Sequence, residues 1–536
     1  MARLLLVDDD PDQLEVRRLL LEQAGHQVST AESAAVAISL FLAQTPEIVV
    51  MDLRLPHTRD GLALIRRLRS ESAATRIMVL SGWAADLANL PEEQMADQVL
   101  TKPVRSQQLV QFIARLALCL IALLPLHAAI AGNDFPFQLD APAEVVADLD
   151  LSAPDADWGR PGREGALAVI TVDGSHSQHV MVYGGQRHHY QVFLGPLDPG
   201  AHTVKVERHP DYSARGAHLE VHNVTYRQYK PTDPLYAVIA NAPVLFARRN
   251  TIGKFTDVPM VLYCERLGDT SLRYTMIFSN EDGAASTRAL MARWGRATSI
   301  EYIYEVWPDK TGKPLRAQIQ TINHKDAGFH GKREGFHPLL GVVTDDNMVA
   351  DDAASPIRYQ LAPVLVDLGN APREKVMDEH PITYLISARE LEREGKLRTF
   401  GKVEGTKIGA PENYLFVEMR LLNKDARVAV LARLREDNFF RSSDLGVYDM
   451  GIERGGWVRT AIELPPATQP AQVAEIAFQC LPDARSEGAG SCRVDAIGKM
   501  FFLNSKQTPD PSFYRPGMDR GPWVIPAGEI RLLPLR

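Results

Sequence analysis

The stretch LLLVDDDPD, residues 4–12, decides the fold of the N-terminal part of the chain. Four apolar residues in a row are typical of a strand that is buried on both faces of a parallel sheet. Three carboxylates follow where such a strand would end, and a proline at position 11 suits the first turn of a helix. The stretch therefore predicts a buried strand, an acidic loop and a helix, in that order.

The same alternation of strand and helix continues to about residue 115. Further strands are predicted at 27–30, 48–51, 77–80 and 98–101, with helical segments between most of them. Five strands alternating with helices predict a doubly wound α/β domain around a five-stranded parallel sheet. In such sheets ligands bind at the carboxyl ends of the strands, near the switch in strand order.

Polar side chains stand at those strand ends, namely Asp8, Asp9, Asp52, Ser81 and Lys102. Taken singly, each has a plainer explanation as a helix cap, a turn residue or solvated surface. Taken together, three carboxylates repel one another unless a divalent cation joins them, and hard oxygen ligands suit Mg²⁺. A carboxylate beside Mg²⁺ and an ammonium group can attack a phosphoryl group. The pattern predicts a magnesium-dependent phosphoryl site.

Four motifs carry a family resemblance: LLLVDDDPD, IVVMDLRLP followed by DGL, IMVLSG, and VLTKPV. With them, residues 1–115 resemble a response-regulator receiver domain, which is CheY-like and flavodoxin-like in fold. The resemblance implies that Asp52 accepts the phosphoryl group. It also implies that Asp9 and Asp52 bind Mg²⁺ directly, that Asp8 helps through water, and that Arg54 contributes its backbone carbonyl.

The resemblance further implies that Ser81 and Lys102 contact the phosphoryl group and that a sensor histidine kinase is the phosphodonor. Two departures stand out. Val99 takes the place three residues before the lysine where the family usually has an aromatic residue, and the loop after Asp52 is one residue longer than usual. We expect the phosphorylation chemistry to survive both departures and the output route to differ from the usual one.

An apolar segment follows. Residues 116–132 read LALCLIALLPLHAAIAG, and no charged side chain occurs between Arg115 and Asp134. As a helix at 1.5 Å per residue the segment would be about 25 Å long, near the short end of what spans a bilayer. Residues 129–131, Ala-Ile-Ala, are what a signal peptidase reads. We expect a transmembrane or signal-peptide-like helix, with a buried helix ending at Pro125 or a chance fusion of two reading frames as alternatives.

The flanks of this segment predict an orientation. Arg105 and Arg115 precede it and acidic residues follow it, which favours a cytoplasmic N-terminal side. The chain runs from Met1 straight into the first predicted strand, without a signal peptide. We expect a membrane protein with a cytoplasmic receiver and with residues 133–536 periplasmic or extracellular. A wholly cytoplasmic chain is the alternative.

Short alternating runs, glycine and proline dominate the remainder. Turn signals about every ten residues predict a β-sandwich over 133–230. A β-rich domain is predicted over 231–395, and a sandwich or jelly-roll-like domain over 396–536. We therefore expect a multidomain chain.

One helix is predicted inside the middle region, at 387–394. Ser387 and Glu390 have the spacing of a capping box, and Gly395 follows as a stop signal. This pattern predicts a helix that begins at the serine.

Candidate chemistry in the remainder is sparse. One polar stretch contains His324, Asp326, His330 and His337, which are residue types that ligate metals or transfer protons. Their spacing matches no known ligand pattern, so a polar surface loop is the plainer explanation. Trp294, Tyr302, Tyr304 and Trp307 would bind a carbohydrate by stacking if they were exposed, although alternating aromatic residues in strands are more often core.

The cysteines and the net charge limit the cellular compartment and the class of partner. Cys480 and Cys492 are close in sequence and would form a disulfide in an oxidising compartment, whereas in the cytoplasm they would be two thiols. A net charge of −8 with no basic stripe argues against a nucleic-acid partner.

The sequence thus predicts phosphorelay signal transduction through Asp52, linked to an exported β-rich region. The alternative is an exported β-sandwich protein that binds a small molecule or carbohydrate, or a hydrolase, with the receiver as a fused passenger.

Overall fold

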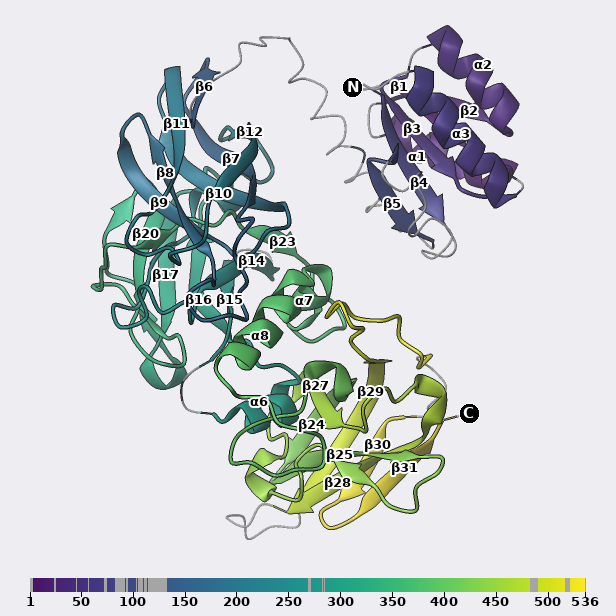
Figure 1. Ribbon diagram of the computed structural model, residues 1–536, viewed down its shortest axis with the longest axis vertical. Coiled ribbons are helices and arrows are strands. Elements are labelled where there is room, and N and C mark those ends of the chain that lie inside the picture. Colours follow the sequence, from purple (N-terminus) through teal and green to yellow (C-terminus); the bar gives the residue numbers. More distant parts are fainter. Residues whose placement is uncertain are drawn as a thin grey trace. The chain divides into compact units, whose positions relative to one another are not determined.

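A computed structural model gives the fold (Figure 1). The chain divides into two compact units, residues 1–129 and 130–536, which we describe separately. The structure describes residues 3–535 except 24–25, 45, 56, 72–74, 82–91, 93–94, 103, 105–108, 110–112, 114–132, 269–270, 282, 284, 483–489 and 516–520.

The first unit contains a five-stranded parallel sheet in the order β2-β1-β3-β4-β5. Its strands are β1 (Arg3–Val7), β2 (Gln27–Ala31), β3 (Ile48–Asp52), β4 (Arg76–Ser81) and β5 (Gln98–Thr101). Its described helices include α1 (Pro11–Gln23), α2 (Ala34–Gln44) and α3 (Thr58–Glu71). The sequence-based prediction of a five-stranded parallel sheet is confirmed. The strand order reverses between β1 and β3, which puts the ligand-binding edge of such a sheet beside them.

The apolar run in β1 is continuous because the strand is covered on both faces. Successive side chains of a strand point to opposite faces. Leu5 accordingly packs in one hydrophobic cluster with Phe41 of α2, and Leu6 packs in another with Leu14 of α1. Both leucines are 1% exposed, so the sheet is fixed from both sides and its carboxyl edge is held in register.

The second unit is built almost entirely from antiparallel sheets (Figure 1). The strands of its first part are β6 (Asp134–Leu139), β7 (Ala143–Ser152), β8 (Ala166–Val172), β9 (Ser175–Val182), β10 (His188–Leu197), β11 (Gly200–Arg208) and β12 (Glu220–Tyr229). They form a three-stranded sheet, β10-β7-β12, and a four-stranded sheet, β6-β11-β8-β9. Both sheets contribute to one hydrophobic cluster.

The middle part contains a five-stranded sheet of short strands and a six-stranded sheet, β18-β17-β16-β15-β14-β23. Its strands are β13 (Val244–Phe246), β14 (Pro259–Leu267), β15 (Ser271–Phe278), β16 (Ile300–Pro308), β17 (Pro314–Thr321), β18 (Lys325–Gly328), β19 (Arg333–Glu334), β20 (His337–Val342), β21 (Val349–Ala350), β22 (Arg358–Tyr359) and β23 (Val364–Val366). Its helices are α5 (Tyr236–Ala240), α6 (Thr287–Trp294), η3 (Ile322–His324), α7 (Lys375–Glu379) and α8 (Ile382–Arg393).

The last part contains two four-stranded sheets, β27-β24-β29-β30 and β26-β25-β28-β31. Its strands are β24 (Tyr414–Lys424), β25 (Ala426–Leu434), β26 (Arg441–Ser442), β27 (Gly456–Glu463), β28 (Val473–Pro482), β29 (Ser491–Phe501), β30 (Trp523–Pro526) and β31 (Ile530–Pro534). Short 3-10 helices are η4 (Pro411–Asn413), η5 (Tyr448–Met450) and η6 (Pro470–Gln472).

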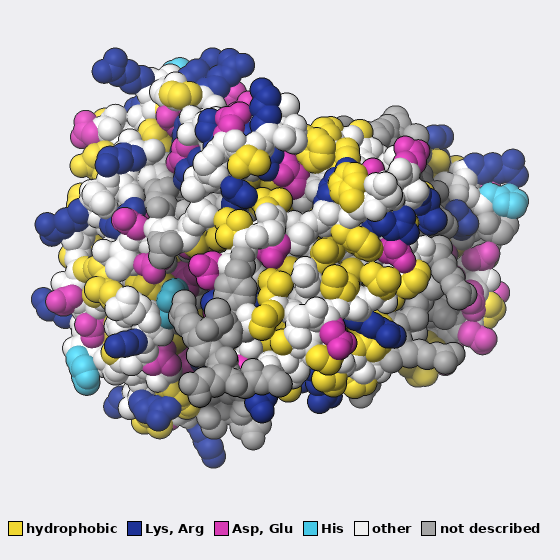
Figure 2. Space-filling model, turned by 90° about the horizontal axis from the view of Figure 1, so that it is seen from below, with side chains coloured by type: hydrophobic (Ala, Val, Ile, Leu, Met, Phe, Trp, Pro, Cys, Tyr) yellow, Lys and Arg dark blue, Asp and Glu magenta, His cyan; other side chains and the backbone are white. Residues whose placement is uncertain are grey.

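Viewed from below, hydrophobic side chains gather over part of the molecular surface (Figure 2).

Each sheet of the second unit falls within one of the regions 133–230, 231–395 and 396–536, whereas two hydrophobic clusters extend across their boundaries. One cluster runs from Leu139 to Ile386 and another from Val261 to Leu503. The β-rich character of residues 133–536 agrees with the prediction. The division into three domains and the sandwich class stay predictions.

Helix α8 corrects one prediction. It begins at Ile382, so Ser387 and Glu390 lie inside the helix and do not form a capping box. Glu390 is fully buried and its Oε2 accepts a hydrogen bond from Trp158 Nε1 at 3.0 Å. The end of the helix was predicted correctly, since Gly395 follows it with a φ of +64°. The serine–glutamate spacing was misleading because both side chains are used for tertiary packing.

No helix among the described residues is both long and apolar enough to cross a bilayer. The segment predicted to do so, residues 116–132, lies outside the residues that the structure describes.

Candidate functional site

The candidate site lies at the carboxyl edge of the parallel sheet in the first unit. Asp8 and Asp9 follow β1, and Asp52 is the last residue of β3. Ser81 ends β4, and Lys102 follows β5. The fold thus brings all five predicted polar residues to one edge of the sheet.

The three carboxylates converge. One oxygen from each of Asp8, Asp9 and Asp52 lies within 4.8 Å of the others. Asp8 is 2% exposed, while Asp9 is exposed and Asp52 is half-buried, so the group opens to solvent on one side. An all-oxygen set with room for water is what Mg²⁺ requires, and these residues fit that ion.

Lys102 links two of the carboxylates. Its Nζ donates to Asp52 Oδ2 at 2.7 Å and to Asp8 Oδ2 at 3.3 Å. Its backbone N–H donates to the Ser81 carbonyl at 2.7 Å, which fixes the start of the side chain beside the end of β4. The ammonium group is therefore held where it can neutralise charge on the oxygens of Asp52.

Arg17 of α1 also enters the site, and sequence analysis missed it. Its Nη1 donates to Asp8 Oδ2 at 2.5 Å, and its Nη2 donates to Gln13 Oε1 at 3.1 Å. The helix is capped by Asp10, whose Oδ1 accepts from the backbone N–H groups of Asp12 at 3.0 Å and Gln13 at 3.2 Å. The sequence did offer one signal for Arg17. A helix that begins at the acidic loop has its second turn near that loop, and Arg17 lies in that turn.

The loop after β3 is held close to α3. A Cβ atom at Gly61 would lie 2.0 Å from the Leu53 carbonyl oxygen, so only glycine fits there. The Arg54 backbone N–H lies 3.4 Å from Asp52 Oδ1 and donates to it. The glycine of the DGL motif thus lets the helix pack against the backbone that follows Asp52. Val99 on β5 is half-buried against the hydrophobic cluster around Leu5.

The polar stretch of the second unit does not form one site. His337 is 1% exposed, with Nδ1 at 2.8 Å from the Ala242 carbonyl and Nε2 at 3.1 Å from Glu144 Oε2. His324, Asp326 and His330 are exposed. Within the described part of the chain, Asp8, Asp9 and Asp52 form the only group of three or more candidate metal ligands.

His324 has acidic neighbours that sequence analysis did not single out. Its ring nitrogens lie 3.8 Å from Glu301 Oε2 and 3.8 Å from Asp346 Oδ2. Burial raises the pKa of the nearby Glu281 to about 7, and Arg296 opposes that rise while Glu301 adds to it. These acids come from separate loops and strands, so no local pattern announces them.

The four aromatic residues do not form a flat exposed surface. Tyr304 is 0% and Tyr302 8% exposed, and Trp294 lies on α6 rather than on a strand. Trp307 is covered by the Arg316 guanidinium, 3.6 Å from the ring centroid.

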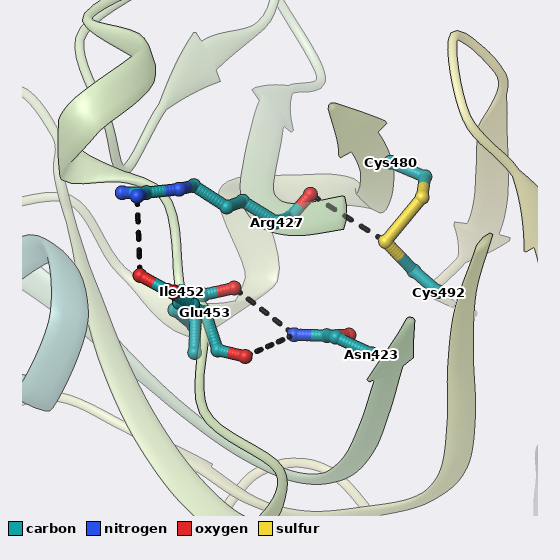
Figure 3. Close-up of a disulfide and its surroundings, with 6 residues drawn as sticks. All are labelled: Asn423, Arg427, Ile452, Glu453, Cys480 and Cys492. Carbon is teal, nitrogen blue, oxygen red and sulfur yellow. Dashed lines mark hydrogen bonds and ion pairs between the residues drawn. A yellow bond between two sulfur atoms is a disulfide. The ribbon is translucent and has the colours of Figure 1, made fainter. Parts of the chain in front are cut away.

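Cys480 of β28 and Cys492 of β29 form a disulfide (Figure 3). The bond joins the two four-stranded sheets of the last part, since the two strands belong to different sheets. Both cysteines are 0% exposed, and Cys492 Sγ lies 3.5 Å from the Arg427 carbonyl oxygen. The Arg427 guanidinium in turn pairs with Glu453 Oε2 at 3.1 Å (Figure 3).

Known proteins resemble the first unit. The family model described as response regulator receiver domain matches residues 4–114. The virulence transcriptional regulatory protein PhoP of Salmonella typhi is 34% identical over 146 residues, covering 26% of this chain and 61% of PhoP. The chain thus spans less than two thirds of that relative.

Two further proteins match over nearly their whole length. The protein PilH of Pseudomonas aeruginosa is 32% identical over 116 residues, covering 21% of this chain and 95% of PilH. A crystal structure of a response regulator receiver domain protein from Clostridium thermocellum is 27% identical, with a TM-score of 0.21, covering 22% of this chain and 94% of that one. Through its first unit, the chain belongs to the response-regulator receiver family.

Proposed function

We propose that the chain is a phosphorelay protein in which Asp52 accepts a phosphoryl group from a phosphohistidine of a sensor histidine kinase. The observation that carries the proposal is the convergence of Asp8, Asp9 and Asp52 around Lys102, whose Nζ lies 2.7 Å from Asp52 Oδ2. An Asp52 oxygen attacks phosphorus, the P–N bond breaks, and the histidine nitrogen leaves with its electron pair.

Asp9 and Asp52 would hold Mg²⁺ directly, together with the Arg54 backbone carbonyl, and Asp8 would hold it through water. When bound, Mg²⁺ withdraws negative charge from the attacking and transferred oxygens. Lys102 holds one positive charge against Asp52 and, after transfer, against a phosphoryl oxygen. The Ser81 hydroxyl, buried at the end of β4, donates to another phosphoryl oxygen.

The test is phosphorylation of the full chain by acetyl phosphate with Mg²⁺, measured by intact mass and by lability to hydroxylamine. We expect one acyl phosphate on the native chain and none on Asp52→Asn. Asp12→Asn is the matched control, because Asp12 lies on the exposed first turn of α1 and should leave labelling unchanged. Equal labelling of Asp52→Asn and the native chain would refute the assignment.

We further propose that residues 133–536 function outside the cytoplasm, with residues 116–132 as membrane anchor or export signal. The buried Cys480–Cys492 disulfide supports this location, because such bonds persist in oxidising compartments and are rare in the cytoplasm. A receiver needs the cytoplasmic kinase, so the two units would lie on opposite sides of a membrane. Under the competing proposal, the receiver is a passenger of an exported protein.

Cell fractionation with N-terminal sequencing separates these cases. An intact chain in the membrane, with Cys480 and Cys492 resistant to alkylation, supports the anchored protein. A fragment starting at Gly132 in the exported fraction supports the passenger. An intact chain in the cytoplasm with both thiols alkylated would rule out both.

A further inference from the structure

One oxygen of Asp8 holds two cations at once. Asp8 Oδ2 lies 2.5 Å from Arg17 Nη1 and 3.3 Å from Lys102 Nζ. The Asp8 side chain is 3% exposed and that of Arg17 is 14% exposed, so water screens this contact weakly. Lys102 also reaches Asp52, whereas the ion pair of Arg17 is with Asp8. The two cations therefore differ in role, although they share an oxygen.

The position of Arg17 is built into α1. Gln13, one turn earlier, accepts from Arg17 Nη2 at 3.1 Å and so helps to hold the guanidinium over the acidic loop. The next residue, Arg18, points elsewhere and pairs with Glu15 and Glu22 at 2.7 Å each, with its side chain 31% exposed. Two adjacent arginines of one helix thus have different neighbours, and the second provides a natural control.

The charges show what Arg17 does to the site. Asp8, Asp9 and Asp52 carry three negative charges, and Lys102 and Arg17 carry two positive ones. With Arg17 in place, the five groups carry a net charge of one negative unit. Without Arg17, the remaining four groups carry two negative charges, which a divalent cation would balance.

We propose that Arg17 is an internal counter-ion that competes with Mg²⁺ for Asp8. It thereby sets the Mg²⁺ concentration at which the site becomes competent for phosphoryl transfer. This inference rests on the proposed function, because it concerns the metal that the same carboxylates would hold. Mg²⁺ can enter only if Arg17 leaves Asp8 or if the two cations remain together at an electrostatic cost. Arg17 acts through Asp8 and is a positioning residue.

The experiment is calorimetric titration of MgCl₂ into the full chain and its variants. We expect Arg17→Gln to bind Mg²⁺ about tenfold more tightly, which corresponds to about 1.4 kcal/mol. Arg17→Ala is a second neutral variant and should behave in the same way. Arg17→Lys keeps the charge and should stay within about threefold of the native chain. Arg18→Gln should be unchanged, since its partners lie away from the site.

Asp9→Asn separates the failure of this inference from the failure of the proposed function. If the native chain binds Mg²⁺ and Asp9→Asn does not, the heat comes from the receiver site. Equal or weaker binding by Arg17→Gln and Arg17→Ala then overturns the role of Arg17 and leaves the phosphoryl site standing. If neither the native chain nor any variant binds Mg²⁺, the proposed function itself fails and the inference fails with it.

Labelling by acetyl phosphate gives a second measurement on the same variants. The Mg²⁺ concentration that gives half-maximal acetyl-phosphate labelling should fall in Arg17→Gln by the same factor as the dissociation constant. A labelling midpoint unchanged from that of Arg18→Gln would contradict the proposal.

Discussion

The acidic site of the first unit and the buried charges around Arg459 in the second unit use the same kinds of side chain in opposite ways. Arg459 is 0% exposed, and its guanidinium donates to Asp378 Oδ2 at 2.7 Å and to Glu418 Oε1 at 2.5 Å. It also donates to the Tyr384 hydroxyl at 2.5 Å. In the acidic site, three carboxylates meet two cations and one side is open to solvent.

The difference shows how a charge cluster reveals its role. Burial alone would lower the pKa of the Arg459 guanidinium. Asp378, Tyr384 and Glu418 raise that pKa by more than burial lowers it, so the group stays charged. Lys499 Nζ also pairs with Asp378 Oδ2 at 3.2 Å, so two carboxylates meet two cations there. This balanced cluster joins α7, α8 and three strands of the last part. The acidic site has excess negative charge and an open side. We interpret the balanced cluster as structural and the unbalanced one as functional.

Removing Arg459 should have the largest effect on stability. Arg459→Met removes the guanidinium from Glu418, which is 2% exposed, and leaves Asp378 with Lys499 as its cation. Breaking a buried pair such as Arg459–Glu418 costs about 3 to 5 kcal/mol. Urea unfolding followed by tryptophan fluorescence measures this loss, because every tryptophan except Trp83 lies in the second unit. Labelling of Asp52 should be unaffected.

Arg389→Met is the control for that loss. Arg389 pairs with Glu392 at 2.9 Å, but the two side chains are 50% and 56% exposed. An exposed pair contributes at most about 1 kcal/mol. Similar losses for the two variants would mean that the Arg459 cluster is not the structural element that its burial implies.

Removing one negative charge from the acidic site should raise stability, by less than the loss of Arg459 lowers it. Asp9→Asn takes away one of three mutually repelling carboxylates, and without Mg²⁺ we expect the first unit to gain about 1 kcal/mol in unfolding free energy. Hydrogen exchange of β1 and β3 amides measures it. Asp12→Asn, in the first turn of α1, should give no gain, since an acidic residue there favours the helix. A loss of stability in Asp9→Asn would remove the contrast between the two clusters.

Much of the first unit was predictable because its signals are local. Each buried strand is a short apolar run, and the polar residue that ends it lies next to it in sequence, as Asp8 follows Val7. The parallel fold then gathers those ends at one edge. Arg17 was not predictable in this way, because its contact with Asp8 depends on where α1 turns back over the loop.

The second unit was predictable only in class. Strand patterns indicated a β-rich region, but the contacts that give the residues their roles are distant in sequence. Trp158 and Glu390 are 232 positions apart, and Arg459 and Asp378 are 81 apart. Glu390 therefore looked like the end of a capping box, and no sequence pattern singled out Arg459. Local patterns cannot distinguish such partners from solvent-exposed charges.

The continuity of the hydrophobic cores has a consequence for how residues 133–535 unfold. One cluster connects Leu139 with Ile386, and another connects Val261 with Leu503, so neither end of the unit can open without exposing apolar surface of its middle. Amides in β7 and in β24 should therefore exchange with solvent through one shared cooperative opening. A ligand that stabilises any one of these sheets would slow exchange in all of them.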